Sequence, residues 1–148
     1  EILESFFVHI VRNAVDHGIE TVQERVACGK PEAGLIRIEL AEEKSDLLIS
    51  VGDDGKGIDF QALRMSALAS GKITNEELAG YSDEKSVELL FLPGVSTLNK
   101  VTETSGRGVG LDVVYTAIKK AGGSIKITSN AGSGTKIELR LPTTFKET

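Results

Sequence analysis

The chain has 148 residues, close to the usual size of one domain, and can bury a hydrophobic core without disulfides or metal ions. Hydrophobic residues make up 40% and charged residues 26%, and no stretch approaches the roughly 18 apolar residues of a membrane span. A net charge of −5 with dispersed Lys and Arg argues against a nucleic-acid surface. We expect one soluble domain over residues 1–148, with no nucleic-acid partner and no direct membrane insertion.

Cys28 is the only cysteine, which excludes an internal disulfide and a thiolate metal cluster and favours a reducing, cytoplasmic location. We expect it to be a small apolar filler rather than a nucleophile. The chain starts at Glu1 without an initiator Met or an apolar leader, so we expect no secretion signal and a fragment of a longer protein.

Helical periodicity opens the chain and then gives way to alternation. Apolar residues at helical spacing predict a helix over residues 1–18 that ends at Gly18, and a shorter helix follows over residues 21–28. Residues 35–40 and 47–51 are typical of strands, and the polar stretch 42–46 between them is typical of a hairpin. Asp53 is therefore expected at the end of a strand.

The second half repeats this order. Helices are predicted over residues 60–69, 83–91 and 109–121, and residues 94–106, rich in Ser, Thr, Gly and Asn, are predicted to form a long functional loop, interpreted as a lid. Residues 124–129 and 135–141 are predicted strands joined by a tight turn. Hairpins rather than βαβ crossovers predict an α+β fold: a two-layer α/β sandwich with a mixed, mainly antiparallel sheet and helices on one face.

The first helix carries a polar stripe. His9, Asn13 and Asp16 are spaced i, i+4 and i+7, so they share one face of a regular helix. An Asn amide oxygen suits Mg²⁺, which is completed by substrate phosphates, so Asn13 is the first metal-ligand candidate, and His9, one turn before it, is the second. In isolation, a solvated polar face is the commoner explanation of such a stripe.

The two histidines have different expected roles. His9 has a side chain whose pKa lies near working pH, so it is a candidate base or orienting group, with a backbone hydrogen bond as the equally weighted alternative. His17 closes the helix, where the negative end of the helix dipole favours a cationic imidazole.

Residues 53–58 follow a predicted strand and contain two glycines. A carboxylate at Asp53 can accept a hydrogen bond from an exocyclic amine such as adenine N6, and Gly55 and Gly57 allow close approach of the backbone to a base. Taken alone this is a common turn sequence, but its spacing does not match a calcium loop.

Residues 106–110 precede a helix, so their backbone N–H groups predict an anion site for a di- or triphosphate, to which Arg107 adds charge. Their G-x-G-x-G pattern is neither a dinucleotide fingerprint nor a P-loop, and a merely flexible glycine loop is the alternative. Gly134 and Thr135 begin the last strand, where the Thr135 hydroxyl either contacts phosphate or closes the turn.

These segments, in this order, resemble the ATP-binding domain shared by histidine kinases, gyrase B subunits, Hsp90 chaperones and MutL proteins. Residues 9–18 resemble its N box, 53–57 its G1 box, Phe91 its F-box position, 106–110 its G2 box, and 134–135 its terminal Gly-Thr element. Within that superfamily, residues 9–20, 92–97 and 105–114 resemble the chemotaxis-type kinases.

The resemblance implies a Bergerat fold that binds ATP and Mg²⁺, with Asn13 holding the metal, Asp53 binding adenine, the lid folding over the phosphates, and His9 where many relatives have a Glu base. The candidate nucleotide-binding residues are Asn13, Asp16, His17, Asp53, Gly55, Gly57, Ile58, Arg64, Ser96, Thr97, Gly106, Arg107, Gly108, Val109, Gly110, Leu111 and Thr135, with His9 as the catalytic candidate.

The implied reaction is transfer of the ATP γ-phosphoryl to a histidine on a separate phosphotransfer domain of the same kinase. A dimerisation domain, a response regulator, a coupling protein and a receptor are the further partners implied. Two alternatives remain: a nucleotide-binding regulatory module without phosphotransfer, and a gyrase- or Hsp90-like ATPase, whose Glu is replaced here by His9. The chain begins within the N-box helix, and Ala62 and Ser66 stand where basic residues are common, so a missing sheet edge and weaker nucleotide binding are expected.

Overall fold

The computed structural model describes residues 2–92 and 111–143, and its contacts divide the chain into two compact units. One unit comprises residues 1–9 and 59–117, and the other comprises residues 10–58 and 118–148. The predicted lid and the G2 segment up to Gly110 lie outside the described residues.

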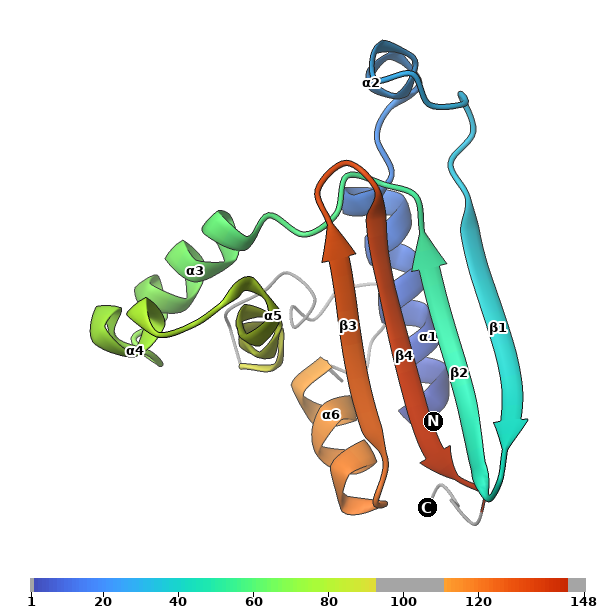
Figure 1. Cartoon of the computed structure of the whole chain (residues 1–148), viewed down its shortest axis with the longest axis vertical. Coiled ribbons are helices and arrows are strands. Elements are labelled where there is room, and N and C mark those ends of the chain that lie inside the picture. Colours follow the sequence, from blue (N-terminus) through green and yellow to red (C-terminus); the bar gives the residue numbers. More distant parts are fainter. Residues whose placement is uncertain (1, 93–110, 144–148) are drawn as a thin grey trace. The chain divides into compact units, whose positions relative to one another are not determined.

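A four-stranded sheet dominates the unit of residues 10–58 and 118–148 (Figure 1). It consists of β1 (Ile36–Glu43), β2 (Asp46–Asp53), β3 (Ser124–Asn130) and β4 (Gly134–Pro142), in the order β1-β2-β4-β3. All three pairings among these strands are antiparallel, so the predicted α+β class with a mainly antiparallel sheet is confirmed. Both predicted hairpins are present, and the first turns at Lys44, which has a φ of 57°.

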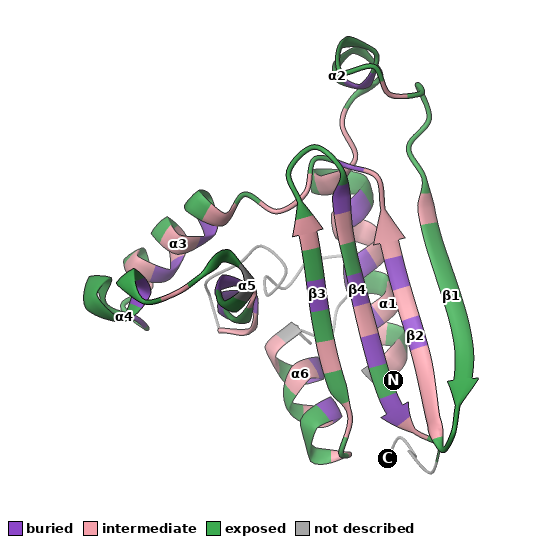
Figure 2. Cartoon of the chain, viewed as in Figure 1, coloured by how far each residue is buried: buried purple, intermediate pink, exposed green. Residues whose placement is uncertain are grey.

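Alternation along the strands separates two faces of the sheet (Figure 2). Ile49 and Val51 of β2 are buried, as are Ile137, Leu139 and Leu141 of β4, and the register places Val51 opposite Ile137 and Ile49 opposite Leu139. Lys136, Glu138 and Arg140 of β4 and Ser50 of β2 occupy alternate positions, which makes the opposite face of the sheet the more polar one.

The predicted N-terminal helix is confirmed, but its last turn is not α-helical. The α-helix α1 spans Ile2–Asn13, and a π-helical turn, η1, continues it over Ala14–Gly18. The Ile19 N–H donates to the Ala14 carbonyl at 2.7 Å, five residues back, so the chain gains an extra residue in this turn. The following helix α2 (Val22–Ala27) begins after the cap residue Thr21, whose hydroxyl accepts from the Glu24 N–H. Cys28 at its end is exposed, so the prediction of a buried apolar filler is wrong.

Short helices make up most of the described part of the unit of residues 1–9 and 59–117. Besides the first part of α1, they are α3 (Phe60–Ala69), α4 (Asn75–Ala79), α5 (Asp83–Ser86), the 3₁₀ turn η2 (Val87–Phe91), and α6 (Leu111–Lys120), which continues into the other unit. The side chains of Asp59, Thr74 and Ser82 cap α3, α4 and α5. The prediction of one helix over 83–91 is therefore replaced by two short turns, and α4 was not predicted.

Candidate nucleotide site

Asp53 is the last residue of β2 and continues the strand face of Ile49 and Val51. Its Oδ1 accepts a hydrogen bond from the Gly55 N–H at 2.9 Å. Burial raises the pKa of the Asp53 carboxyl, and backbone hydrogen bonds from Gly55 and Thr135 oppose that rise only in part. The carboxylate is thus half-buried at a strand end, as the sequence predicts.

The end of the N-box segment packs against this strand end. The Lys56 N–H donates to the Gly18 carbonyl oxygen at 2.8 Å, and a Cβ at Gly55 would lie 2.1 Å from that oxygen. A Cβ at Gly18 would in turn lie 3.7 Å from both carboxylate oxygens of Asp53. Only a glycine at position 55 permits so close an approach.

The β3–β4 turn closes the other side of residues 53–58. Gly134 has a φ of +110°, and a Cβ there would lie 1.9 Å from the Asp53 carbonyl oxygen. Gly57, with a φ of +82°, would bring a Cβ within 2.6 Å of the Asn130 carbonyl oxygen. The Ile58 N–H donates to the Ser129 hydroxyl at 2.7 Å.

Three of the four motif segments therefore meet around Asp53 within one unit: the end of the N box at Gly18, residues 53–58, and the Gly-Thr element at 134–135. The sequence predicts that Gly55 and Gly57 let the backbone approach a base, whereas in this structure they let it approach Gly18 and Asn130. The Thr135 hydroxyl lies 3.2 Å from the Ser129 hydroxyl, which is the turn-closing option of its two expected roles.

A buried charge cluster that sequence reasoning missed holds the same turn. Arg25, on α2, is fully buried and donates from Nη2 to Asp54 Oδ2 at 2.9 Å and from Nη1 to Glu20 Oε1 at 3.0 Å. Lys30 Nζ contacts Glu20 Oε2 and donates to the carbonyl oxygens of Asp54 and Gly55, at 2.9 Å each. No regular spacing connects these residues, so periodicity does not reveal them.

The charges of this cluster are mutually compensated. The hydrogen bond from Lys30 holds the pKa of Glu20 below its usual range. Burial acts to raise the pKa of Asp54, but hydrogen bonds from the Leu35 N–H and from Arg25 outweigh it and lower that pKa. The hydrogen bond with Asp54 raises the pKa of Arg25. Two cations thus face two ionised carboxylates beside Asp53.

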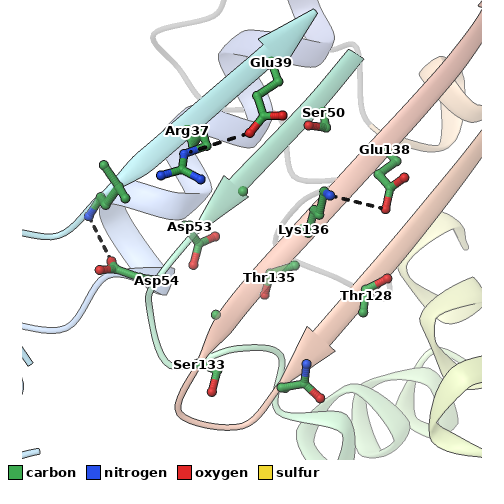
Figure 3. A pocket seen from close by; sticks show the side chains of 14 residues that line it. Arg37, Glu39, Ser50, Asp53, Asp54, Thr128, Ser133, Thr135, Lys136 and Glu138 are labelled. Carbon is green, nitrogen blue, oxygen red and sulfur yellow. Dashed lines mark hydrogen bonds and ion pairs between the residues drawn. The ribbon is translucent and has the colours of Figure 1, made fainter. Parts of the chain in front are cut away.

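An open groove of about 570 Å³ lies over the polar face of the sheet (Figure 3). Arg37, Gly52 and Lys136 form one cross-strand row of it, and Glu39, Ser50 and Glu138 form the next. Asp53 and Thr135 line its end. Ser50 and Gly52 lie on the opposite face of the sheet from Ile49, Val51 and Asp53. The groove therefore lies over that opposite face, and Asp53 borders it only at its end.

The polar stripe of the first helix is altered by the π-helical turn. His9 is buried and Asn13 is half-buried, both on α1, whereas Asp16 and His17 are exposed on η1. The i, i+4, i+7 spacing assumes a regular helix, and the wider turn after Asn13 breaks it before Asp16.

Arg64 donates to the Tyr81 carbonyl oxygen at 2.8 Å and to the Ser86 hydroxyl at 3.2 Å. These contacts join α3 to the segment around α5.

Phe91, at the F-box position, stacks on Tyr115 of α6 with ring centroids 4.3 Å apart. Leu111 is the first residue of α6. The remaining candidates, Ser96, Thr97 and residues 106–110, are not described.

Among residues 2–92 and 111–143, no group of three or more His, Cys, Asp and Glu side chains is placed to hold a metal ion. One oxygen ligand that the N-box segment carries is the side-chain amide of the half-buried Asn13. Mg²⁺ binds through one or two protein oxygens and substrate phosphates, so this donor set fits that ion with nucleotide present. Within the same described residues, no helix combines the length and apolar character of a membrane span.

Comparison with known proteins identifies relatives over most of the chain. Residues 2–144 match the family model described as histidine kinase-, DNA gyrase B-, and HSP90-like ATPase. The chain is 43% identical to the sensor histidine kinase CheAY of Helicobacter pylori, over 93% of this chain and 17% of that protein. It is 45% identical to the gliding motility regulatory protein of Myxococcus xanthus, over 91% of this chain and 17% of that protein. The Bacillus subtilis chemotaxis protein CheA is 39% identical, over 93% of this chain and 20% of that protein.

A solved histidine kinase domain, from a blue-light activated kinase of Erythrobacter litoralis, aligns with 96% of this chain and 43% of that one, at 14% identity and a TM-score of 0.49. The chain spans at most a fifth of the length of the three relatives named above. The family match itself covers nearly all of the chain. The chain therefore belongs to the histidine kinase-, DNA gyrase B- and HSP90-like ATPase family and is an ATP-binding domain of that family.

Proposed function

We propose that this chain is the catalytic ATP-binding domain of a chemotaxis-type histidine kinase, which transfers the ATP γ-phosphoryl to a histidine on a separate phosphotransfer domain. The single observation that carries the proposal is the convergence of three motif segments on the half-buried Asp53 carboxylate. Relatives named as CheA proteins and a sensor histidine kinase support the kinase reaction over a gyrase- or Hsp90-like ATPase.

Asp53 is proposed to recognise adenine. An ionised carboxylate accepts but does not donate hydrogen bonds, so it suits the exocyclic amine of adenine. The Gly55 N–H fixes one carboxylate oxygen at 2.9 Å, and an oxygen atom retains further lone pairs for a ligand. Gly57, Ile58 and Thr135 complete the proposed base-binding end through the backbone of the same turns.

Asn13 is proposed as the protein ligand of Mg²⁺, because hard cations prefer oxygen donors. His9 is proposed to orient a group or to accept a proton near the γ-phosphoryl rather than to bind the metal directly. Its ring offers only nitrogen atoms as metal ligands, whereas Mg²⁺ prefers oxygen. Bound Mg²⁺ would neutralise phosphate charge. Asp16, His17 and Arg64 remain proposed contacts to the nucleotide.

The phosphates are proposed to bind at residues 106–111, through Gly106, Arg107, Gly108, Val109, Gly110 and Leu111, with Ser96 and Thr97 in the lid. The N-terminus of a helix such as α6 suits an anion, and phosphoryl transfer depends chiefly on positioning and charge neutralisation. The acceptor histidine would come from a phosphotransfer domain, and a dimerisation domain, response regulator, coupling protein and receptor belong to the same proposal. So does a cytoplasmic location, where ATP is available.

The test is calorimetric titration of the chain with Mg²⁺ and a non-hydrolysable ATP analogue, repeated with Asp53→Asn. Binding by the unmutated chain and a loss of on the order of tenfold or more in affinity for the variant are expected. No binding at millimolar nucleotide contradicts the site. Transfer of labelled phosphate to a supplied histidine phosphotransfer domain, with His9→Ala as control, separates a kinase from a binding module without phosphotransfer.

A further inference from the structure

Two cations hold the turn that follows Asp53, and they do so through its backbone. Arg25 Nη1 donates to the Asp54 carbonyl oxygen at 3.3 Å, and Lys30 Nζ donates to the same oxygen and to the Gly55 carbonyl oxygen. Gly55 is also the residue whose N–H binds the Asp53 carboxylate. The peptide group that carries this donor, and the next peptide group along the chain, are therefore held by side chains from α2 and the loop after it.

Arg25 is itself held from several directions. Its Nε donates to the Pro31 carbonyl oxygen at 2.7 Å and its Nη2 to the Ala33 carbonyl oxygen at 3.3 Å, in addition to the ion pairs with Glu20 and Asp54. A planar guanidinium with five donors can satisfy this set, whereas an ammonium group cannot. So many contacts, on a side chain that is fully buried, fix the Asp54–Gly55 backbone more firmly than a solvated turn would be.

The cluster also sets the charge next to Asp53. Glu20 and Asp54 are the two carboxylates nearest in the network, and Arg25 and Lys30 balance them. Loss of either cation leaves unbalanced negative charge beside the Asp53 carboxylate, which disfavours its ionised form.

From this geometry we infer that Arg25 and Lys30 are positioning residues for adenine selection: they hold the Asp54–Gly55 peptide that orients the Asp53 carboxylate, without touching the nucleotide. The inference rests on the proposed function, because it concerns the same base-binding carboxylate. Arg25 and Lys30 lie outside all four motif segments, 9–18, 53–57, 106–110 and 134–135.

Base selectivity gives a measurement that a merely structural role would not change. Inosine triphosphate has a carbonyl oxygen where ATP has the N6 amine, so a correctly placed carboxylate prefers ATP. A misplaced carboxylate loses that preference, whereas a partly unfolded protein binds both nucleotides less well in equal proportion. The ratio of the two dissociation constants therefore separates positioning from folding.

The experiment measures dissociation constants for ATP and inosine triphosphate, each with Mg²⁺, for the full chain and its variants. Lys30→Gln is the main variant, because Lys30 lies at the edge of the cluster, with 16% of its side chain exposed. We expect its preference for ATP to fall on the order of tenfold, almost wholly through weaker ATP binding. Arg25→Gln is expected to show a larger loss, and Arg25→Lys an intermediate one. Lys126→Gln, which removes an exposed lysine of β3, is expected to keep the preference.

Unchanged preference in Lys30→Gln overturns the inference, as does an equal weakening of both nucleotides. Asp53→Asn serves as the reference for complete loss of base selection. If the unmutated chain fails to bind ATP, or binds both nucleotides equally, the proposed adenine role of Asp53 fails and the inference falls with it. If Asp53→Asn abolishes the preference but the Lys30 and Arg25 variants retain it, only the inference fails.

Discussion

The backbone N–H of Lys56 donates a hydrogen bond to the carbonyl oxygen of Gly18 at 2.8 Å. This bond joins the end of the N-box segment to the turn that follows Asp53, two segments that lie far apart in the sequence. Carbonyl groups in the last turn of a helix have no intrahelical donor, and the Gly18 carbonyl accepts from the Lys56 N–H instead. The contact therefore satisfies a helix end and fixes the G1 turn at once.

Gly134→Ala is expected to lower the free energy of unfolding by about 3 kcal/mol, because the new Cβ would strain a positive-φ backbone and overlap the Asp53 carbonyl oxygen. Urea denaturation measures the loss. Gly132→Ala in the same turn is the matched control: its φ is +79°, but no atom lies within 4 Å of its Cβ position. It is expected to cost only about 1 kcal/mol. Equal losses for both variants contradict the close packing at Gly134.

Asp53→Asn is expected to remove a pH dependence of stability. Burial raises the folded-state pKa of Asp53 above its ordinary value of 3.8, so the folded protein binds this proton more tightly than the unfolded chain does. That contribution is present below pH 3.8 and is lost as the pH rises through the folded-state pKa. At pH 7 the variant should therefore unfold no more easily than the wild type, with a gain below about 1 kcal/mol because the carboxyl is half-exposed.

The same variant is expected to lose adenine-nucleotide affinity, so stability and binding should change in opposite directions. Denaturation profiles at several pH values, compared with titrations at pH 7, provide the measurement. A variant that is markedly less stable than the wild type at neutral pH would show that the ionised carboxylate stabilises the fold.

Glu20→Gln is expected to flatten the loss of stability in acid. The hydrogen bond from Lys30 lowers the folded-state pKa of Glu20 below 4.5, so the ionised group contributes stability above pH 4.5 that is lost as the pH falls through the folded-state pKa. Thermal denaturation between pH 6 and about pH 3 tests this. The exposed residue Glu32 supplies the control variant Glu32→Gln, for which the wild-type pH profile is expected. An identical acid profile for Glu20→Gln would exclude a stabilising ionised Glu20.

Arg64→Gln is expected to destabilise the protein by about 1–2 kcal/mol, since it breaks the bonds to the Tyr81 carbonyl and the Ser86 hydroxyl. Lys72→Gln, at an exposed lysine of the same unit, is the control for loss of a positive charge. Chemical denaturation and ATP titration of both variants distinguish the two roles of Arg64. Weaker ATP binding with unchanged stability would instead assign the guanidinium to the phosphates.

Much of the fold follows from local pattern. The alternation in residues 35–51 and 124–141 predicts two hairpins, and both occur with nearly the predicted bounds. The predicted helix over 60–69 matches α3, because Asp59 caps its start and Leu63 and Ala67 bury one face. The prediction for 83–91 was less accurate, since α5 ends at Ser86 and a 3₁₀ turn continues over Val87–Phe91. The helix α4, which Thr74 caps, is too brief for a clear period.

Glycine spacing predicted part of the backbone packing around Asp53. Glycines at 55 and 57 indicated close approach of the backbone, and each of them would bring a Cβ within 3 Å of another backbone atom. The sequence predicts a base as the partner in that approach, and the structure adds Gly18 and Asn130 as backbone neighbours, because spacing along the chain does not name what lies across a turn. The close approach at Gly134 was not predicted. The role of Arg25 was missed for the same reason: its partners Glu20 and Asp54 are 5 and 29 positions away.

Local sequence pattern predicted both hairpins, the alternation along their strands, most of the helices, and the four motifs that led to the ATPase family. Those properties depend on residues near one another along the chain, so they can be read from it. The pattern did not reveal the π-helical turn that breaks the polar stripe before Asp16. Nor did it reveal that Gly18, Asp53 and Gly134 meet at one point, or that Arg25 is buried among compensating charges. These features depend on contacts between distant residues, and such contacts are set by packing of the whole unit.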